Sequence, residues 1–147
     1  VRCLRKLEYC INTHKLRRYY YHWKHERLQI KSGIELNANC CEKGIFISHG
    51  KIVVSSAAKI GEGCKILSDV TIGGQGRYDI PGAPIIGKRV FIGTGAKIIG
   101  NVEIADDCVI GANAVVVHSI TESGVTIAGN PAKIVSRNNS YHYLNRK

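Results

Sequence analysis

The sequence contains no methionine, only three prolines and no long apolar run. Because residue 1 is not a methionine, we expect the chain to be a trimmed piece of a longer product. No stretch approaches the ~20 apolar residues that a membrane-spanning helix needs, and the basic start does not lead into the apolar core of a secretory signal. With 44% apolar residues, the composition is typical of a soluble, globular, single-domain chain.

The cysteines and histidines are too few and too scattered to predict a disulfide framework or a zinc site. Six cysteines make up about 4% of the 147 residues, below the ~8–10% of disulfide scaffolds. Cys40 and Cys41 are adjacent, no Cys-x-x-Cys spacing occurs, and no pattern with the six histidines is typical of zinc. We therefore expect reduced thiols and no metal cofactor.

The net charge of +10 is concentrated at the amino end of the chain. Residues 1–31 carry nine Lys or Arg against two Glu, a net charge of +7. Basic and aromatic side chains are interleaved over residues 17–24, and apolar residues recur at helical spacing. We expect a basic helical arm over residues 1–31. Its composition would suit packing against the domain or a partner subunit, binding of nucleic acid, or an anionic membrane surface.

A period of six residues dominates the rest of the chain. The repeated aliphatic positions are Val54, Ile60, Ile66, Ile72 and, after an interruption, Ile86, Ile92, Ile98, Ile104, Ile110 and Val116. This period matches neither a helix nor a lone strand, because each hexad holds a short strand and a turn. Three hexads make one triangular coil, and stacked coils pair their strands ~4.8 Å apart and bury the repeated aliphatic side chains. The sequence therefore predicts an all-β solenoid.

The repeat also sets the boundaries of the domain. We expect the solenoid over residues 32–137 and a polar tail over residues 138–147. The interruption between Ile72 and Ile86 is eight residues longer than a hexad, which predicts a protruding loop at about residues 74–84. Loops on rigid solenoids often carry recognition, and the Gly, Arg and Tyr content of this one suits folding over a ligand.

Two histidines, His49 and His118, fall within the β-domain. His49 lies in a glycine-flanked segment, residues 44–50, where the hexad phase is disturbed just before the regular run begins. An imidazole with an unperturbed pKa near ~6.5 can remove a proton from an alcohol at neutral pH. His49 is therefore a candidate general base, and the alternative is a structural histidine.

Five segments resemble serine O-acetyltransferases and their close relatives, including sugar and polysaccharide O-acetyltransferases, among the hexapeptide-repeat acyltransferases. They keep the family's order and nearly all its spacings over about residues 33–137. The segments are Ile47-Ser48-His49-Gly50, the loop after Thr71-Ile72-Gly73-Gly74, Ile92 to Asn101, Ile110 to Val116, and Ala128 to Val135. The resemblance implies a left-handed parallel β-helix, a homotrimer with sites between adjacent subunits, and acetyl-CoA as co-substrate. The alternative is a non-catalytic β-helix scaffold whose basic arm binds nucleic acid or an anionic membrane.

The resemblance also implies roles for individual residues at the reaction centre. The family's catalytic histidine matches His49, which would take the proton of an acceptor hydroxyl as this attacks the thioester directly. An acidic residue orients that histidine in the family, and its nearest match is Glu35, one residue closer to the histidine than in the family pattern. A surface glutamate is the alternative interpretation of Glu35.

The matched positions for CoA lie further along the chain. Thr94 and Ala112 match places where the family's backbone follows the pantetheine arm, and Gly74 falls in the loop that covers it. Small residues permit such a close approach. Lys133 and Arg137 would meet the CoA phosphates, with a solvated charge beside a closing turn as the alternative for Lys133.

Two departures from the family pattern concern the acceptor. Members that acetylate serine carry a second histidine where this chain has Ala83, and an acidic residue where it has Ser48. The acceptor therefore stays open between L-serine and a sugar or polysaccharide hydroxyl. A hexapeptide carbonic anhydrase would need three histidine ligands, and the β-domain has two. Acetyl-CoA and reduced thiols both indicate a cytoplasmic protein.

Overall fold

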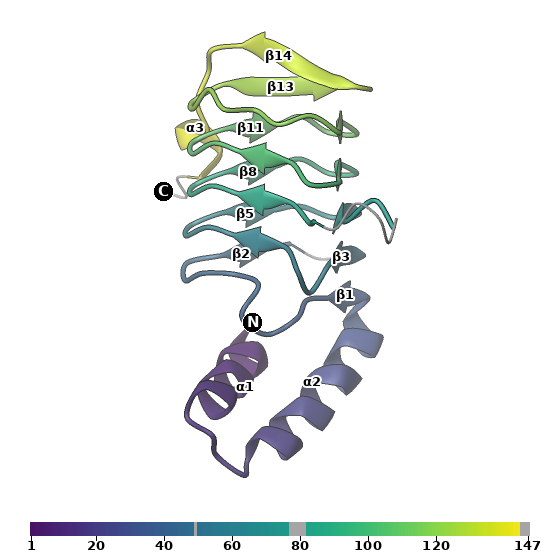
Figure 1. The fold of residues 1–147 in the computed structure, drawn as a ribbon, viewed down its shortest axis with the longest axis vertical. Coiled ribbons are helices and arrows are strands. Elements are labelled where there is room, and N and C mark those ends of the chain that lie inside the picture. The colour runs from purple at the N-terminus through teal and green to yellow at the C-terminus, as the bar shows by residue number, and fades with distance from the viewer. Residues whose placement is uncertain (49, 77–81, 145–147) are drawn as a thin grey trace.

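The computed structural model describes residues 1–48, 50–76 and 82–144 and begins with two helices (Figure 1). Helix α1 spans Arg2–Asn12 and helix α2 spans Arg18–Ser32, and the two pack against each other below the β-domain. Helix α2 ends at Gly33, whose φ of 68° is left-handed. Glycine adopts this conformation without steric penalty, so the chain turns here from the helix into the first strand.

Fourteen short strands follow in the described residues. Their bounds are β1 Ile34–Glu35, β2 Phe46–Ile47, β3 Ile52–Val54, β4 Lys59–Ile60, β5 Lys65–Ile66, β6 Val70–Gly73, β7 Ile85–Ile86, β8 Phe91–Ile92, β9 Lys97–Ile99, β10 Glu103–Ile104, β11 Val109–Ile110, β12 Val115–Val116, β13 Thr126–Gly129 and β14 Ala132–Ser136. From β3 to β12, successive strands join three sheets in strict rotation. We call these sheet A (β1-β3-β6-β9-β12), sheet B (β4-β7-β10) and sheet C (β2-β5-β8-β11-β13-β14).

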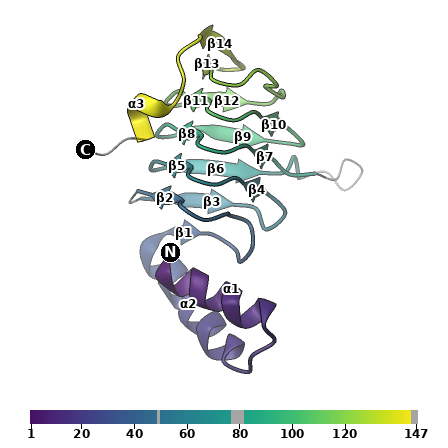
Figure 2. The ribbon, with the colours of Figure 1, turned by 90° about the vertical axis from the view of Figure 1, so that its left-hand side faces the viewer.

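The chain therefore winds as a three-sided coil whose neighbouring turns are parallel, except that β14 returns antiparallel to β13 (Figures 1 and 2). Each turn uses three hexads, so Val54 pairs with Ile72, 18 residues later. Ile72 pairs in turn with Ile98, 26 residues later, because the interruption adds eight residues. This register confirms the predicted repeat, and it leaves room for an excursion between β6 and β7.

The repeated aliphatic positions form the core. Ile60, Ile72 and Ile98 are at most 1% exposed, and the same holds for most of their equivalents along the coil. Between hexads, the turns use left-handed residues such as Asp69, Asp107 and several glycines, which the short corners require. A single coil would leave its aliphatic side chains open at both ends, so burial depends on stacking of successive coils.

Helix α1 is fastened to the first coil by a polar cluster. The buried Glu8 carboxylate accepts hydrogen bonds from Arg5 Nη1 at 2.7 Å and from the Asn39 backbone N–H at 2.9 Å. The Arg5 guanidinium also donates to the carbonyl oxygens of Cys41 and Glu42. Arg5 and Glu8 therefore link the arm to the β-domain through its backbone.

The end of the chain lies against sheet C. Helix α3 spans Tyr141–Leu144, and the Tyr143 ring packs on Phe91 with their centroids 4.6 Å apart. Lys65 Nζ donates to the Tyr143 carbonyl at 2.8 Å, and the buried Ser140 donates its N–H to Asp107 O at 3.0 Å. The start of the predicted polar tail thus covers part of the sheet. None of the described helices is long and apolar enough to cross a membrane.

Candidate active site

The turns that lead from sheet C to sheet A stack into a column, which we call the C–A corner (residues 48, 50, 67–69, 93–95 and 111–113). Backbone hydrogen bonds connect each turn to the next coil. They run from Ser48 N to Ile66 O, Leu67 N to Ile92 O, Gly93 N to Ile110 O and Gly111 N to Ile127 O, at 2.8 to 3.0 Å. This ladder brings together residues that are far apart in the sequence.

The candidate base, His49, lies outside the described residues, but its two neighbours are held at the C–A corner. The Ser48 N–H donates to Ile66 O at 2.9 Å. Gly50 has a φ of +100°, and a Cβ at this position would lie 2.7 Å from Ser68 Cβ. Only glycine combines this conformation with this close approach. The segment on either side of the candidate base is therefore anchored to the second coil.

Thr94 and Ala112 occupy matching positions of the C–A corner, one coil apart, and both are exposed. The Asn113 N–H donates to Thr94 O at 2.8 Å. A Cβ on Gly93 would lie 2.7 Å from Ala112 N, so the turns are packed too closely for a side chain between them. The column thus presents small, exposed turns to solvent, as a ligand lying along the backbone would require.

The two cations predicted to meet phosphate are separated by the fold. Lys133 lies near the start of β14, where it pairs with Ala128. Arg137 directly follows the last residue of β14, Ser136, which pairs with Thr126. Arg137 lies four positions after Lys133 along the extended strand, a distance of about 13 Å. Lys133 lies toward the C–A corner, because a Cβ added at Gly111 of that corner would lie 3.1 Å from Cβ of Ala128, the partner of Lys133. Arg137 instead pairs with Glu122, Nε to Oε1, at 3.4 Å.

Gly74 lies at a different corner, where sheet A leads to sheet B and the predicted loop departs. The Gly100 N–H of the next coil donates to Gly73 O at 2.9 Å. A Cβ on Gly74 would lie 2.9 Å from Gly82 O. The two ends of the loop are therefore close together, between the end of β6 and the start of β7. Residues 77–81, in the middle of the loop, lie outside the described residues.

Glu35 lies at the lower end of sheet A, where it pairs with Val53 of β3. Ile34 faces the interior, so alternation along β1 directs Glu35 outward, and its side chain is exposed. Sheet A runs between the C–A corner and the corner that carries the loop. β1, the C–A corner and the described ends of the loop, residues 74–76 and 82–84, therefore border one face of the molecule (Figure 2).

Sequence reasoning missed a cation on this same face. Lys97 pairs with Thr71 in sheet A, and its Nζ donates to Thr71 Oγ1 at 3.1 Å and to Asp69 O at 2.7 Å. The signal was available in the repeat, because Lys97 precedes the inward Ile98 by one residue and must face outward. Its ammonium group is already engaged by two oxygens, so we assign it no role in binding.

Buried thiols do not supply a nucleophile to the described part of the site. All six cysteines lie in the described residues and are free, in agreement with the prediction of reduced thiols. Burial raises the pKa of the Cys64 thiol to about 11 and also raises that of Cys108. Both therefore stay protonated at neutral pH, and they point into the core.

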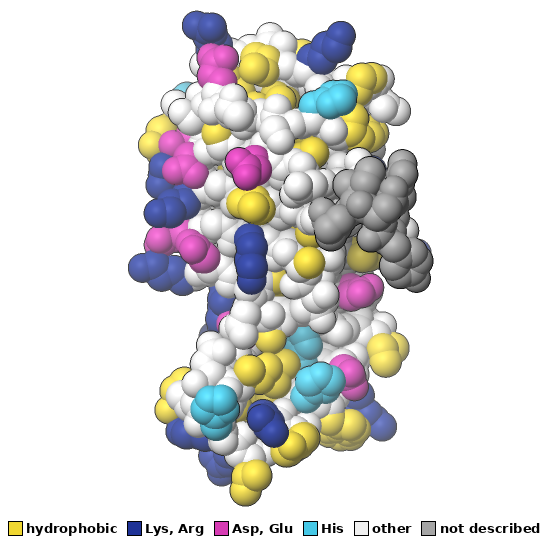
Figure 3. All heavy atoms as spheres, in the orientation of Figure 1, with side chains coloured by type: hydrophobic (Ala, Val, Ile, Leu, Met, Phe, Trp, Pro, Cys, Tyr) yellow, Lys and Arg dark blue, Asp and Glu magenta, His cyan; other side chains and the backbone are white. Residues whose placement is uncertain are grey.

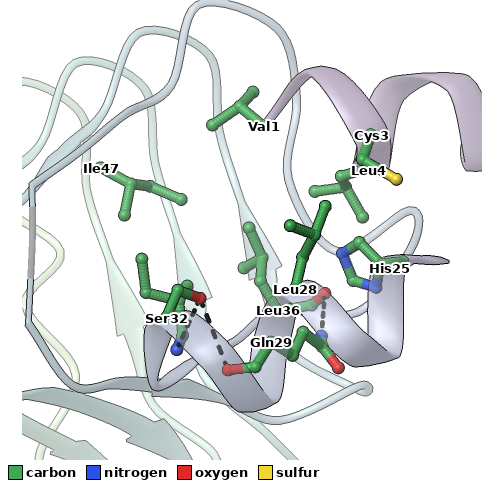
Figure 4. Close-up of a pocket in the computed structure, with 10 residues that line it drawn as sticks. Val1, Cys3, Leu4, His25, Leu28, Gln29, Ser32, Leu36 and Ile47 are labelled. Carbon is green, nitrogen blue, oxygen red and sulfur yellow. Dashed lines mark hydrogen bonds between the residues drawn. The ribbon is translucent and has the colours of Figure 1, made fainter.

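An apolar pocket of about 290 Å³ lies between the two helices and the first coil (Figure 4). It is lined by Val1, Cys3, Leu4, His25, Leu28, Gln29, Ser32, Ile34, Leu36 and Ile47. Gln29 Nε2 donates to Leu36 O at 2.8 Å, and burial lowers the pKa of His25. None of the predicted site residues lines this pocket.

Comparison with known proteins places the repeat in a family. The family model of the bacterial transferase hexapeptide (six repeats) matches residues 83–118. A serine acetyltransferase from Helicobacter pylori is 37% identical over 108 residues, which cover 72% of this chain and 63% of that protein. One from Mycobacterium tuberculosis is 38% identical over 94 residues, which cover 63% of this chain and 41% of that protein. The chain thus spans less than two thirds of these curated relatives.

Solved structures agree with this assignment. The serine acetyltransferase from Brucella abortus strain S19 superimposes with a TM-score of 0.78 at 27% identity, over 94% of this chain and 56% of that one. The same protein in complex with coenzyme A gives a TM-score of 0.76 at 28% identity, over 94% and 55%.

The six-residue register, the rotating parallel sheets and the matched repeats identify the β-domain as a solenoid of the hexapeptide repeats found in bacterial transferases. Among these proteins, the similarity is to serine acetyltransferases. The resemblance deduced from the sequence is thereby confirmed.

Proposed function

We propose that this chain is the repeat portion of an acetyl-CoA-dependent O-acetyltransferase of the serine acetyltransferase type, folded as a left-handed β-helix. The observation that carries this proposal is the similarity to serine acetyltransferases over most of the chain, including a structure in complex with coenzyme A. The C–A corner supports it, because Thr94, Ala112 and the neighbours of His49 all fall in that one column.

In the proposed reaction, His49 accepts the proton of an acceptor hydroxyl while the hydroxyl oxygen attacks the acetyl carbonyl carbon of the thioester. The carbon–sulfur bond then breaks, and the proton passes from His49 to the departing CoA sulfur. No acetyl-enzyme forms. A positioned general base contributes about 10²–10⁴ to the rate. Glu35 would act as a positioning residue that holds the imidazole in the correct tautomer.

The proposed CoA path runs along the C–A corner from Gly50 toward Lys133. Four coil rises separate the level of Ser48 from that of Ala128, a distance of about 19 Å. A ligand that touches both ends must therefore be elongated, as the pantetheine arm of CoA is. Because Arg137 is about 13 Å along the strand from Lys133, the two cations would meet different phosphates or only Lys133 would bind. Gly74 would allow the loop to close over the ligand.

The assembly and the division into parts are further elements of the proposal. Residues 1–31 would serve as a basic arm, residues 32–137 as the catalytic β-helix with its loop at 74–84, and residues 138–147 as a tail. A homotrimer would place the acceptor site between adjacent subunits, and exposed aliphatic side chains on the sheet faces, among them Val53 and Ile85, are suited to packing on a neighbour. We propose a cytoplasmic location, where acetyl-CoA is available.

The acceptor is proposed to be L-serine or a sugar hydroxyl. The names of the relatives favour serine, whereas Ala83 and Ser48 depart from the resemblance on the acceptor side. Purified protein should be assayed for CoA thiol release from acetyl-CoA with serine, homoserine, simple sugars and oligosaccharides.

The matched variants for this assay are His49→Ala and His118→Ala, which remove the two histidines of the β-domain one at a time. We expect His49→Ala to lower thiol release about 10²–10⁴-fold while calorimetry still detects CoA binding, and His118→Ala to remain active. Full activity in His49→Ala would rule out the assigned base. Absence of both activity and CoA binding in the unaltered chain would rule out the transferase function.

A further inference from the structure

The first coil contains a turn that is one residue shorter than its counterpart in the second coil. Ile34 pairs with Ile52, and Cys41 forms a bridge with Ile60. The same path from sheet A to sheet B therefore takes eight residues in the second coil and seven in the first. One position of the repeat is missing between Ile34 and Cys41.

This deletion brings two buried positions next to each other. In the regular hexads a buried corner residue precedes the buried strand residue by two positions, as Cys64 precedes Ile66. In the short turn the two buried residues are Cys40 and Cys41, which are 1% and 6% exposed. They follow Asn39, a left-handed residue with a φ of 62°.

The two thiols consequently lie on the same side of the backbone. Successive side chains of an extended strand point in opposite directions, yet the Sγ atoms of Cys40 and Cys41 are 3.5 Å apart. Cys40 Sγ also donates to Asn37 O at 2.8 Å. The hydrogen bond from the Cys41 thiol lowers the pKa of Cys40, and the same interaction raises the pKa of Cys41. The two thiols are therefore coupled, and a proton is lost more easily from Cys40 than from Cys41.

A groove lies beside this pair. It has a volume of about 550 Å³ and runs along sheet B, and its lining includes both cysteines together with Lys59, Gly61 and Lys88. Arg5 donates to Cys41 O at 2.8 Å and fixes the backbone at the base of the groove. The groove therefore runs beside a pair of almost fully buried thiols that the scaffold holds in one arrangement.

We propose that Cys40 and Cys41 form a two-thiol chelating site for a soft, pyramidal metalloid centre of the trivalent-arsenic class. With bonds to sulfur of ~2.3 Å and an S–M–S angle near ~100°, such a centre holds its two sulfurs about 3.5 Å apart, whereas a linear ion holds them about 4.6 Å apart. Thiolates are the protein ligands that soft centres prefer.

Zinc binding and disulfide formation agree less well with the geometry of the pair. Zinc in proteins takes four ligands, and no group of three or more His, Cys, Asp or Glu that could hold a metal occurs among residues 1–48, 50–76 and 82–144. Adjacent Cα atoms are ~3.8 Å apart across a trans peptide, below the ~4.4 Å lower limit that is usual for disulfides, so direct oxidation would give a strained bond. Chelation requires no such contraction.

Phenylarsine oxide is the probe for this site. Its reaction with the pair forms two arsenic–sulfur bonds and breaks two sulfur–hydrogen bonds, and the arsenic-bound oxygen leaves as water with both protons. No electron is transferred, so no oxidant or reductant is needed. The full chain should bind one equivalent, and Ellman titration after denaturation should then find four reactive thiols instead of six.

The test compares variants of the pair with a solitary buried thiol. Cys40→Ala and Cys41→Ala should each weaken binding of phenylarsine oxide about 10²-fold or more, because one tethered thiol loses the effective concentration of the second. Cys64→Ala should bind like the unaltered chain. Equal binding in all three variants, or no stoichiometric binding to the unaltered chain, would overturn the proposal.

A second measurement keeps the test independent of how the variants fold. Trypsin cleavage after Lys31 and Lys43 releases a peptide, residues 32–43, that contains Cys40 and Cys41 and no other cysteine. Mass spectrometry of the treated, unaltered chain should find one phenylarsenic group on this peptide and none on the others. Recovery of the group on a different peptide would contradict the assignment.

Discussion

In the β-domain the repeated aliphatic side chains are buried, whereas most of the large apolar side chains of α2 are exposed. None of the 15 described residues of α2 is buried, and Leu16 just before it and Ile30 within it are 84% and 85% exposed. The difference lies in which segment covers the apolar side chains of each region. Each coil of the solenoid is covered by the next coil, and the partner is encoded in the same repeat.

The two regions also differ in charge and in the way they meet. Basic side chains and histidines lie beside exposed apolar ones over the helices at the lower end of the molecule (Figure 3). Trp23, for example, carries Arg27 over its ring at 4.6 Å, and such pairs shield exposed aromatic faces only in part. The arm thus depends on α1 and its polar link to the first coil, and the following predictions test that contrast.

The largest expected effect comes from opening the core of the solenoid. Ile98 is fully buried in the middle of the stack, where it pairs with Ile72 and Val116. Ile98→Ala should lower the free energy of unfolding by about 2–5 kcal/mol, through lost burial and the cavity left behind. Ile30→Ala, at an exposed isoleucine of the arm, should change it by less than about 0.5 kcal/mol.

Denaturant unfolding followed by circular dichroism measures both variants. Similar losses in the two would mean that Ile30 is covered in solution and that the contrast between the regions is wrong.

The repeat made the interior of the solenoid predictable from sequence, because inward positions recur every six residues irrespective of what covers the outside. Ile72, Ile98 and the extra residues between them sufficed to place the core and the interruption of the repeat. The C–A corner could be predicted for the same reason, since Thr94 and Ala112 are 18 residues apart, the length of one coil.

Other features of the structure could not be predicted from the repeat, because they depend on contacts that do not recur every six residues. The fold-back of Ser140 onto Asp107 joins segments that no repeat connects. The short turn at Cys40 and Cys41 breaks the repeat, and cysteine replaces the aliphatic residue that would have revealed the register. The separation of Lys133 from Arg137 follows from β14 being a strand, whereas the sequence motif alone treats the two cations as neighbours.

The second prediction concerns the close packing of the C–A corner. A Cβ added at Gly93 would lie within 2.7 to 2.9 Å of backbone atoms of residues 110–112, which cannot move without shifting the next coil. Gly93→Ala should therefore destabilise the fold by about 1–3 kcal/mol. Gly73→Ala is the matched control, because a Cβ there would meet nothing within 4 Å. Thermal unfolding compares them, and equal melting temperatures would refute the tight stacking.

The third prediction concerns the polar link between helix α1 and the first coil. Glu8→Ala removes the carboxylate that accepts from Arg5 and from Asn39 N–H, and should lower stability by about 1–2 kcal/mol. Glu26→Ala removes an exposed carboxylate that lies 3.5 Å from His22 Nδ1, with an effect below about 0.5 kcal/mol. Hydrogen exchange should accelerate in α1 of the first variant while amides of β6 and β9 keep their protection. Uniform acceleration throughout the chain would show that the arm and the β-domain unfold together.

The smallest effect is expected from protonation of His25 in the pocket between the arm and the first coil. Burial lowers the pKa of His25, and His22 adds to this against the opposite influence of Glu8 and Glu26. The unfolded chain therefore binds this proton more tightly than the folded chain, so stability should fall as the pH drops through ~6.5. In His25→Gln that contribution is absent. Melting temperatures should be measured at about pH 7.5 and 5.5, and the decrease between them should be larger in the unaltered chain than in the variant. Equal decreases would mean that His25 has the same pKa in the folded and unfolded chains, so that the arm does not bury it.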